Sequence, residues 1–207
     1  MDWVNKHLQI VPINTFIDPI FPVENAIITH AHADHAKPGH NNVLATKHTI
    51  EIMKIRYGEN CANNFQELSF NSPLNINGVK VTFFPAGHIL GSAQVLLEYQ
   101  KDKINFTGDF KITKDDTCEN FRPVKCDTLV TEATFGLPIF QHPDPEFEIN
   151  KLIVSIKKFP NRPHLIGVYA LGKAQRLIKL LRNRGYDETI FIHGALEKLF
   201  NYYIKEK

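Results

Sequence analysis

Short apolar runs, separated by glycine, proline and polar clusters, fill the first 131 residues and predict a β-rich region. Residues 7–20 are expected to form two short strands around a turn. Further strands are expected at residues 26–28, 43–45, 79–84, 94–99, 103–107 and 128–131. One helix is predicted to begin at Thr46 or Thr49 and to end at Gly58. A turn at residues 101–102 indicates a hairpin, and we expect hairpins to build most of this region.

The pattern changes after a proline-rich segment at residues 137–146, which is typical of a loop between domains. The elements expected beyond it are a helix at 147–159, a strand at 164–171, a helix at 173–183, a strand at 189–193 and a helix at 195–205. Strands that alternate with helices indicate a parallel βαβ arrangement. We therefore expect two domains, residues 1–143 and residues 144–207.

Composition supports a folded chain with an uneven charge distribution. Apolar residues make up 43% of the 207 residues, which is enough for a sizeable core. Residues 1–150 hold 12 Lys and Arg against 18 Asp and Glu, whereas residues 151–207 hold 12 against 4. The basic last part is suited to a polyanion such as nucleic acid. Ordinary solvated helix surfaces rich in Lys and Arg are the equally weighted alternative.

The cysteines and the apolar runs indicate a cytoplasmic protein. Cys61, Cys118 and Cys126 are an odd, widely spaced set, which favours a reducing compartment over disulfides or a thiolate zinc cluster. The sequence contains no run of eighteen apolar residues, and its first residues lack the pattern of a secretory signal. We therefore expect no membrane association.

Three histidines and an aspartate follow the predicted strand at residues 26–28. Side chains alternate along an extended chain, so His30, His32 and Asp34 are expected to leave the strand end on one side. A turn after Asp34 would bring His35 back to the same point. Imidazole and carboxylate groups are ligands that zinc, iron and manganese accept, and burying so many of them unpaired is costly. The motif therefore predicts a metal site.

Other chemically active residues also stand at predicted strand ends. His88, Asp109 and Glu132 each follow a strand, and strands of one sheet can deliver such groups to a common edge. Asp109 is suited to bridging two metals. Asp18 either orients a ligand imidazole or is a turn aspartate before proline. His40 is interpreted as a surface histidine, with a substrate contact as the alternative.

Four strings carry a resemblance to a known family: THAHADH at residues 29–35, PAGHILGSAQ at 85–94, TGDF at 107–110 and TEATFG at 131–136. They resemble the metallo-β-lactamase fold in its β-CASP nucleic-acid-processing branch. HADHAKPGH, CDTLVTEATFGLPIF and YALGKAQRL are similar to bacterial ligase-associated DNA exonucleases, which are linked to an ATP-dependent DNA ligase and a helicase. The resemblance implies an αββα sandwich followed by the start of a parallel β-CASP domain.

The resemblance also implies a dinuclear zinc site, with manganese as an alternative metal. His30, His32 and His88 would hold one zinc ion. Asp34 and His35 would hold the second, with Asp109 as the bridge.

A zinc-bound hydroxide shared by these ions would hydrolyse a DNA phosphodiester bond. The implied catalytic acids are Asp34, Asp18, which matches the family's first conserved acid, and Glu132, which would orient a proton-donating histidine. In this family that histidine and a last zinc ligand come after the β-CASP insert. Because the sequence ends at Lys207, it resembles an N-terminal fragment.

Lys173 and Arg176 follow Gly172 at a predicted helix start, where free N–H groups and two cations would suit a phosphate. A solvated helix face is the alternative for both residues.

Three other functions remain open. The first is an RNA-processing nuclease of the same branch, like RNase J or the pre-mRNA cleavage endonuclease. The second is a small-molecule hydrolase such as a thioesterase or lactonase. The third is a non-catalytic metal-binding or nucleic-acid-binding protein.

Overall fold

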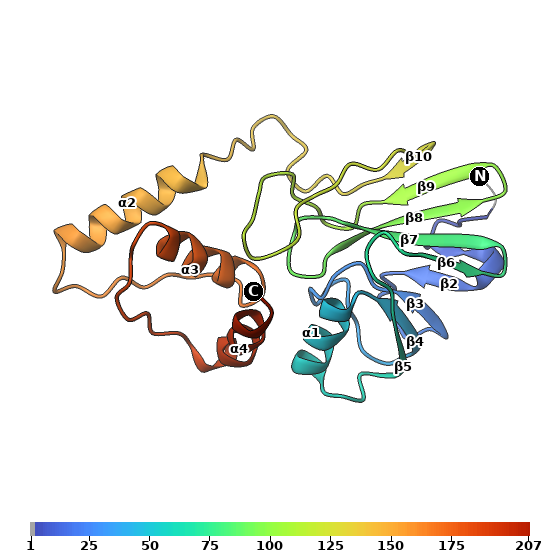
Figure 1. The fold of residues 1–207 in the computed structure, drawn as a ribbon, viewed down its shortest axis with the longest axis horizontal. Helices are drawn as coiled ribbons and strands as arrows, with labels where there is room; N and C mark the ends of the chain where they lie inside the picture. Colours follow the sequence, from blue (N-terminus) through green and yellow to red (C-terminus); the bar gives the residue numbers. More distant parts are fainter. Residues whose placement is uncertain (1–2) are drawn as a thin grey trace. The chain divides into compact units, whose positions relative to one another are not determined.

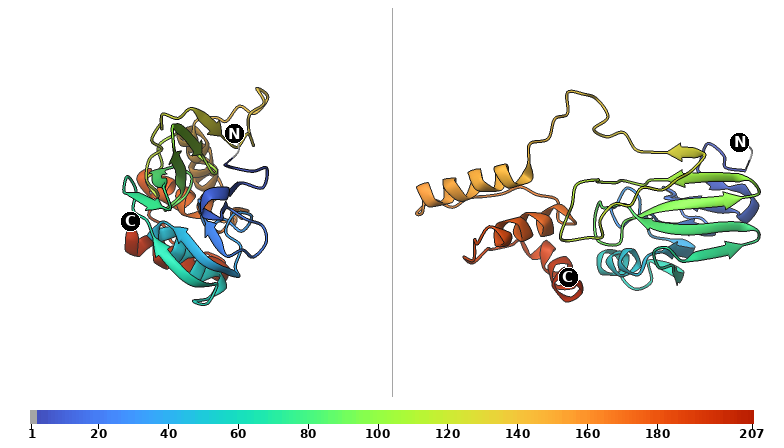
Figure 2. Two further views of the ribbon diagram at one scale, coloured as in Figure 1. Left: turned by 90° about the vertical axis from the view of Figure 1, so that its right-hand side faces the viewer. Right: turned by 45° about the horizontal axis from the view of Figure 1, so that its top comes forward.

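The fold is described from a computed structural model, which covers residues 3–207 (Figures 1 and 2). The chain forms two compact units, Met1–Glu132 and Ala133–Lys207, which are described separately below. The segment at residues 133–143, assigned to the first domain from the sequence, groups with the second unit. Among the described residues, every helix is too short or too polar to cross a membrane.

The first sheet of unit Met1–Glu132 is mostly parallel. Its strands, in spatial order, are β1 (Gln9–Ile10), β2 (Thr15–Ile17), β3 (Asn25–Ile27), β4 (His40–Ala45) and β5 (Ala62–Glu67). Only β1 and β2 are antiparallel. The expectation of a mainly hairpin-built region is therefore wrong for this sheet. The apolar runs specify where strands form, but the length of each connection permits either direction, and here the connections cross over.

The second sheet contains the predicted hairpins. Its spatial order is β10 (Thr128–Val130), β9 (Asp102–Phe106), β8 (Ala93–Tyr99), β7 (Val79–Pro85) and β6 (Pro73–Ile76). Strands β6 to β9 pair antiparallel, and β10 pairs parallel with β9. Because β7 and β9 both run antiparallel to β8, they point the same way and end at the same edge.

The hydrophobic core lies between the two sheets, which Figure 1 shows as two layers. Every second residue of β7 and β8 faces it, as the two-residue repeat of a strand requires. The buried members of the core are Trp3, Ile10, Ile13, Ile17, Ile27, Leu44, Leu68, Val79, Val81, Phe83, Ala93, Val95, Leu97, Ile104 and Phe106. The apolar residues of the predicted strands therefore form the inner faces of the sandwich.

Helix α1 (Lys47–Tyr57) connects β4 to the parallel strand β5. Its N-cap is Thr46, whose side chain accepts a hydrogen bond from the backbone N–H of Thr49 at 3.3 Å. The helix ends at Gly58, as predicted, and it buries Ile50 and Met53. Its apolar side thus covers part of the first sheet, on the side of β5.

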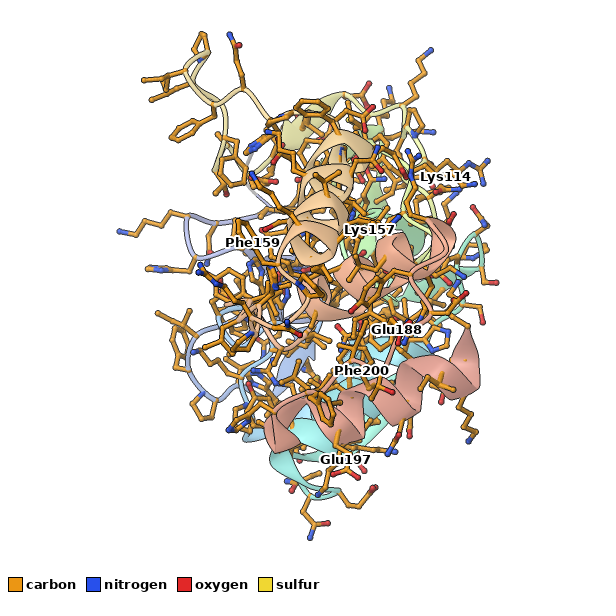
Figure 3. All side chains as sticks on the ribbon, turned by 90° about the vertical axis from the view of Figure 1, so that its left-hand side faces the viewer. Lys114, Lys157, Phe159, Glu188, Glu197 and Phe200 are labelled. Atoms are coloured by element: carbon orange, nitrogen blue, oxygen red, sulfur yellow. The ribbon has the colours of Figure 1, made fainter. Side chains whose placement is uncertain are left out.

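Unit Ala133–Lys207 contains the three predicted helices, α2 (Pro145–Lys158), α3 (Lys173–Asn183) and α4 (Glu197–Glu206), with a short 3₁₀ helix η2 (Gly194–Leu196) before α4. Asp144 caps α2 by accepting from the N–H of Glu146 at 2.8 Å. Helix α4 buries Leu199, Phe200 and Tyr203, and Figure 3 places Phe200 on this helix.

The strands predicted at residues 164–171 and 189–193 are wrong, because the structure assigns neither segment to a strand. An isolated extended segment is not stable without a hydrogen-bonded neighbour, and this unit offers none among its described residues. Leu165 is 94% exposed and Phe191 is 92% exposed. The parallel βαβ arrangement expected for this part is therefore absent from the described residues. The fold class itself, mixed α/β with two sheets and helices, is confirmed.

Candidate metal centre

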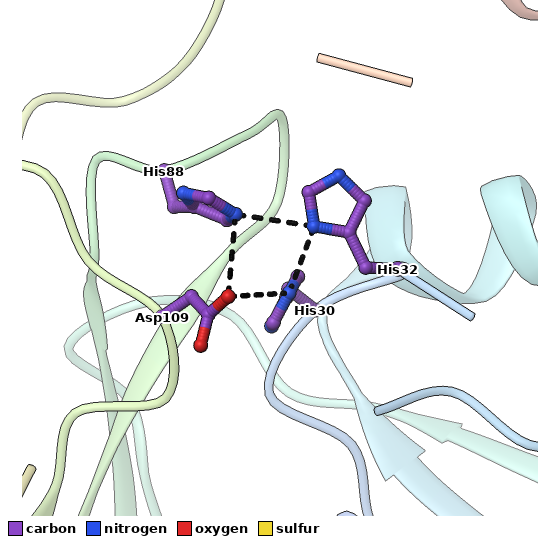
Figure 4. Close-up of side chains that lie close together, drawn as sticks. All are labelled: His30, His32, His88 and Asp109. Carbon is purple, nitrogen blue, oxygen red and sulfur yellow. Dashed lines mark hydrogen bonds and ion pairs between the residues drawn. The ribbon is translucent and has the colours of Figure 1, made fainter. Parts of the chain in front are cut away.

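The candidate metal centre lies where several strands of the sandwich end. His30 and His32 follow β3, His88 follows β7 and Asp109 follows β9. In Figure 4, His30 and His32 approach from the first sheet, and His88 and Asp109 approach from the second. The predicted delivery of these side chains to a common edge is therefore observed for this group.

Three imidazole nitrogens and one carboxylate oxygen converge in this first cluster. Nδ1 of His32 lies 3.1 Å from Nε2 of His30 and 3.1 Å from Nε2 of His88. Oδ2 of Asp109 lies 3.9 Å from Nε2 of His30 and 3.7 Å from Nε2 of His88. His30 is completely buried, whereas the other three side chains are partly exposed.

The donor set and its spacing fit a transition-metal ion. Zinc–nitrogen bonds of about 2.0–2.1 Å in a tetrahedron place neighbouring ligand atoms about 3.3–3.4 Å apart. The observed separations of 3.1–3.9 Å bracket this value. Small movements of the side chains would therefore allow all four atoms to bind one cation.

A second cluster surrounds His35. Its Nδ1 lies 2.8 Å from Oδ2 of Asp18, and its Nε2 lies 3.4 Å from Oδ1 of Asp109. The two oxygens of Asp109 thus face different groups, Oδ2 the first cluster and Oδ1 His35. Asp18 adopts a left-handed backbone conformation, with φ of 45°, which is uncommon for a residue other than glycine.

Asp34 lies apart from these two clusters. Its side chain is 79% exposed, and its Oδ2 is 3.8 Å from Nε2 of His35. The close groups of potential ligands among the described residues do not include Asp34. Of the predicted second ligand set, His35 and Asp109 therefore lie close together, and Asp34 lies at the solvent side of His35. Their binding of a metal stays a prediction.

Burial and neighbouring charges separate the pKa values of the histidines. Burial, with the nearby His35, His32 and His88, lowers the pKa of His30 well below its usual value. Burial and His32 lower the pKa of His88 to about 4, against the opposing effect of Asp109.

His35 differs from the other histidines of the site. Burial lowers its pKa, but hydrogen bonds to Asp109 and Asp18 outweigh burial and raise the pKa to about 10. The same hydrogen bond with His35 lowers the pKa of Asp109. The first cluster therefore combines the neutral imidazoles of His30 and His88 with a negative carboxylate, which is the state that a cation requires of its ligands. His35 is protonated near neutral pH, and it would have to give up one proton before a cation could bind it.

The loop that carries His88 is held by hydrogen bonds to two side-chain hydroxyl groups. The Ser92 hydroxyl oxygen accepts hydrogen bonds from the N–H of His88 at 3.0 Å and from the N–H of Ile89 at 3.2 Å. The Thr46 hydroxyl donates to the carbonyl of Gly91 at 2.7 Å. These contacts join the His88 loop to the start of α1.

Sequence reasoning missed Thr29 and Arg56. Thr29 is buried and donates its hydroxyl to Oδ2 of Asp18 at 2.6 Å. Arg56, on α1, donates to the carbonyl of Ala31 at 2.5 Å and so supports the turn between His30 and His32. The position of Thr29 next to His30 was a signal in the sequence. Arg56 offered none, because its partner is 25 residues away.

Glu132 and the two predicted cations occupy different units. Oε1 of Glu132 lies 3.5 Å from the backbone N of Phe110, the residue after Asp109. Lys173 is exposed at the start of α3, with Nζ 5.1 Å from the centre of the Tyr169 ring. Arg176 is partly exposed one turn later. Their role in binding nucleic acid stays a prediction.

His40 is not a surface histidine, so that interpretation is wrong. It is 1% exposed, because it begins β4 inside the first sheet. Its Nδ1 accepts from the N–H of Val23 at 3.3 Å, and its Nε2 has no hydrogen-bond partner among the described residues.

Comparisons with known proteins identify a family profile and several named relatives. The sequence profile of the Beta-lactamase superfamily domain matches residues 2–146. A probable DNA ligase of Opitutus terrae is 28% identical over 200 residues, which are 95% of this chain and 19% of that protein. The endoribonuclease ysh1 of Aspergillus fumigatus is 37% identical over 144 residues, 67% of this chain and 16% of the relative.

Two further matches extend this picture. The cleavage and polyadenylation specificity factor subunit 3 of Dictyostelium discoideum is 35% identical over 123 residues, 56% of this chain and 15% of the relative. The chain spans less than a fifth of each of these three relatives. A crystal structure of a protein of unknown function from Enterococcus faecalis V583 matches 83% of this chain and 53% of that chain, with a TM-score of 0.53 and 18% identity. This last likeness concerns the fold alone.

Proposed function

This chain belongs to the metallo-β-lactamase superfamily, and we propose that it is a metal-dependent hydrolase of nucleic-acid phosphodiester bonds. The family profile covers most of the chain. The named relatives of the chain include endoribonucleases and a probable DNA ligase. Because the chain spans only a small part of those relatives, this activity is inferred from the site and not transferred from them.

The observation that carries the proposal is the convergence of His30, His32, His88 and Asp109. Three imidazole nitrogens and a carboxylate oxygen lie 3.1–3.9 Å apart at the edge of the sandwich. A structural role alone would not require four titratable groups to face one another around a completely buried imidazole. We assign this group to one zinc ion, with manganese as the alternative metal.

The second cation is assigned to His35, Asp34 and Asp109. The bridging role of Asp109 is supported by its two oxygens, of which one faces the first cluster and the other lies 3.4 Å from His35. When bound, two such cations lower the pKa of a coordinated water and neutralise charge on the phosphate oxygens.

The chain's own residues hold and orient these groups. Asp18 accepts from Nδ1 of His35 and so directs the opposite nitrogen towards Asp109. We assign Asp34, whose side chain is exposed beside His35, to the side from which water or substrate would enter. Glu132, next to Asp109 through the backbone of Phe110, is assigned to orient a proton donor.

We propose DNA as the substrate and exonucleolytic repair as the setting, linked to an ATP-dependent ligase and a helicase. The probable DNA ligase matched over 95% of this chain supports that choice. Lys173 and Arg176 are proposed phosphate contacts in the basic second unit. The endoribonuclease relatives support RNA as a substrate equally well, so RNA processing is the second candidate. Three widely spaced cysteines, two of them buried, support a cytoplasmic location.

The proposal is tested on the purified 207-residue chain with labelled DNA and RNA strands in parallel, and with a thioester and a lactone as small-molecule controls. We expect cleavage of nucleic acid that a chelator abolishes and that added zinc or manganese restores. His32→Ala should lower the rate at least about 100-fold, since it removes the imidazole that lies 3.1 Å from both His30 and His88.

His7→Ala is the matched control, because His7 is an exposed histidine of the same unit. It should leave rate and metal content unchanged. Preference for DNA would support the exonuclease, and preference for RNA the second candidate. Metal binding without any cleavage, or an unchanged rate in His32→Ala, would refute the proposed hydrolase.

A further inference from the structure

The hydroxyl of Thr29 lies between two groups of the candidate metal centre. Its Oγ1 donates to Oδ2 of Asp18 at 2.6 Å and lies 3.1 Å from Nδ1 of His30. Thr29 is 1% exposed and His30 is completely buried, so solvent does not compete for either contact. A hydroxyl has a single proton, and an oxygen that donates it to Asp18 can only accept from His30.

We infer that Thr29 is a positioning residue that holds His30 in the tautomer with its proton on Nδ1. A neutral imidazole carries one proton, so Nε2 of His30 then presents a lone pair. Nε2 is the atom that lies 3.1 Å from Nδ1 of His32 and 3.9 Å from Oδ2 of Asp109. Thr29 thereby keeps the innermost imidazole ready to bind a cation.

The opposite tautomer would be harmful in two ways. A proton on Nε2 of His30 would point at Nδ1 of His32 and occupy the lone pair that a metal needs. The unprotonated Nδ1 would then face the lone pairs of the Thr29 oxygen at 3.1 Å, without a proton between them. Thr29 therefore disfavours a hydrogen bond that would otherwise close the site in the metal-free chain.

One carboxylate orients two histidines. Oδ2 of Asp18 accepts both from the Thr29 hydroxyl and from Nδ1 of His35 at 2.8 Å, and its Oδ1 accepts from the N–H of Thr29 at 2.7 Å. An ionised carboxylate only accepts, so both donors must point towards it. Asp18 therefore orients His35 directly, and it sets the tautomer of His30 through Thr29.

The tautomer is tested by two-bond proton–nitrogen correlation spectra of the ¹⁵N-labelled, metal-free chain near neutral pH. The signal of His30 is assigned by its loss in His30→Gln. We expect the proton on Nδ1 in the natural chain and in Thr29→Ser, which keeps the hydroxyl. In Thr29→Val, which keeps the shape but removes the hydroxyl, we expect the proton on Nε2 or shared between the two nitrogens.

A second measurement is the zinc affinity, and only this part rests on the proposed function. Thr29→Val should weaken zinc binding about 10–100-fold, the usual effect of losing an outer partner of a ligand histidine. Thr29→Ser should bind zinc like the natural chain. Thr15→Val is the matched control, since its buried hydroxyl donates to the carbonyl of Ile13 at 3.0 Å, away from the histidines.

The two measurements distinguish a failure of the inference about Thr29 from a failure of the proposed function. A proton on Nε2 of His30 in the natural chain, or an unchanged tautomer in Thr29→Val, would overturn the inference. Equal weakening of zinc binding in Thr15→Val would overturn it as well, by showing a general loss of stability. If Thr29→Val does not fold, the spectra of the natural chain and of Thr29→Ser still decide. A chain that binds no zinc would refute the proposed function while the spectra still test the tautomer.

Discussion

At the scale of the residue, the candidate centre depends on side chains whose two polar atoms contact two different groups. Asp109 turns one oxygen to the first cluster and the other to His35. His35 uses one nitrogen for Asp18 and the other for Asp109. The sequence identified these residue types and their strand-end positions. It could not identify which atom faces which group, because that depends on side-chain rotation fixed by partners far away in the chain.

Asp109→Asn should lower the number of zinc ions bound per chain, because it removes the one negative charge that both clusters share. Elemental analysis after dialysis measures this number, and Asp127→Asn serves as a carboxylate control from the same unit. Oδ2 of Asp127 accepts a hydrogen bond from the backbone N–H of Lys103 at 2.9 Å, away from the histidines. Full zinc content in Asp109→Asn would exclude the bridging assignment.

Asp115 should make stability depend on pH in the acid range. Burial raises its pKa, but hydrogen bonds from Lys111 and Thr117 outweigh burial and lower the pKa below its usual value. Its contribution is therefore present above the unfolded-state pKa of about 3.9 and is lost as pH falls through the lower folded-state pKa. Asp115→Asn should cost about 1–3 kcal/mol of unfolding free energy at neutral pH.

Denaturant unfolding at several pH values tests this dependence. The difference between the natural chain and Asp115→Asn should narrow as the medium is taken below about pH 4. A difference that stays constant down to the acid limit would show that the charge of Asp115 contributes nothing.

At the scale of the element, the sequence predicted the positions of the helices and of most strands, but, apart from the hairpin at residues 101–102, it did not predict which strands pair or in which direction. The predicted strands at residues 79–84 and 94–99 are observed as β7 and β8, which lie inside the second sheet. They were predictable because their apolar residues are the ones that the sheet buries. The parallel pairing of β3 with β4 was missed, since neither run contains information about strand direction. The run at residues 164–171 is apolar enough for a strand, but the structure assigns it to no strand.

Gly91→Ala should disturb the loop that delivers His88. Gly91 has φ of +81°, and an added Cβ would lie 2.6 Å from Cβ of His48 and 2.8 Å from Oγ1 of Thr46. The loop must therefore move, and we expect both a lower thermal midpoint and weaker zinc binding.

Gly58→Ala is the control for backbone strain without crowding. Gly58 has φ of +92°, and nothing lies within 4 Å of an added Cβ. The Gly58→Ala variant should lose about 1–3 kcal/mol of unfolding free energy and keep the zinc affinity of the natural chain. Equal zinc affinity in both variants would show that the environment of Gly91 does not position His88.

At the scale of the whole molecule, charge is unevenly divided between the two units. Residues 1–132 hold 12 Lys and Arg against 15 Asp and Glu, and residues 133–207 hold 12 against 7. The sequence alone shows this asymmetry, which suits a polyanionic partner and an ordinary solvated surface equally. Composition cannot specify which cations would contact the phosphates, because that requires the placement of one unit against the other.

The double variant Lys173→Glu with Arg176→Glu should weaken nucleic-acid binding and reduce the slope of its salt dependence by about 1 for each phosphate that is no longer bound. Fluorescence anisotropy at several salt concentrations measures both quantities. Lys198→Glu with Lys205→Glu, on exposed positions of α4, is the charge-matched control. If the two double variants weaken binding equally, general charge and not a defined phosphate site accounts for the attraction.

The central claim is that a cation binds among His30, His32, His88 and Asp109. X-ray absorption at the zinc edge of the zinc-loaded chain tests it most directly, because the chain also contains three cysteines whose sulfur atoms are competing ligands. The predicted spectrum has only nitrogen and oxygen donors at about 2.0–2.2 Å, with the outer-shell scattering of imidazole rings, and His88→Ala reduces that scattering. A sulfur shell at about 2.3 Å, or imidazole scattering unchanged in His88→Ala, would contradict the claim.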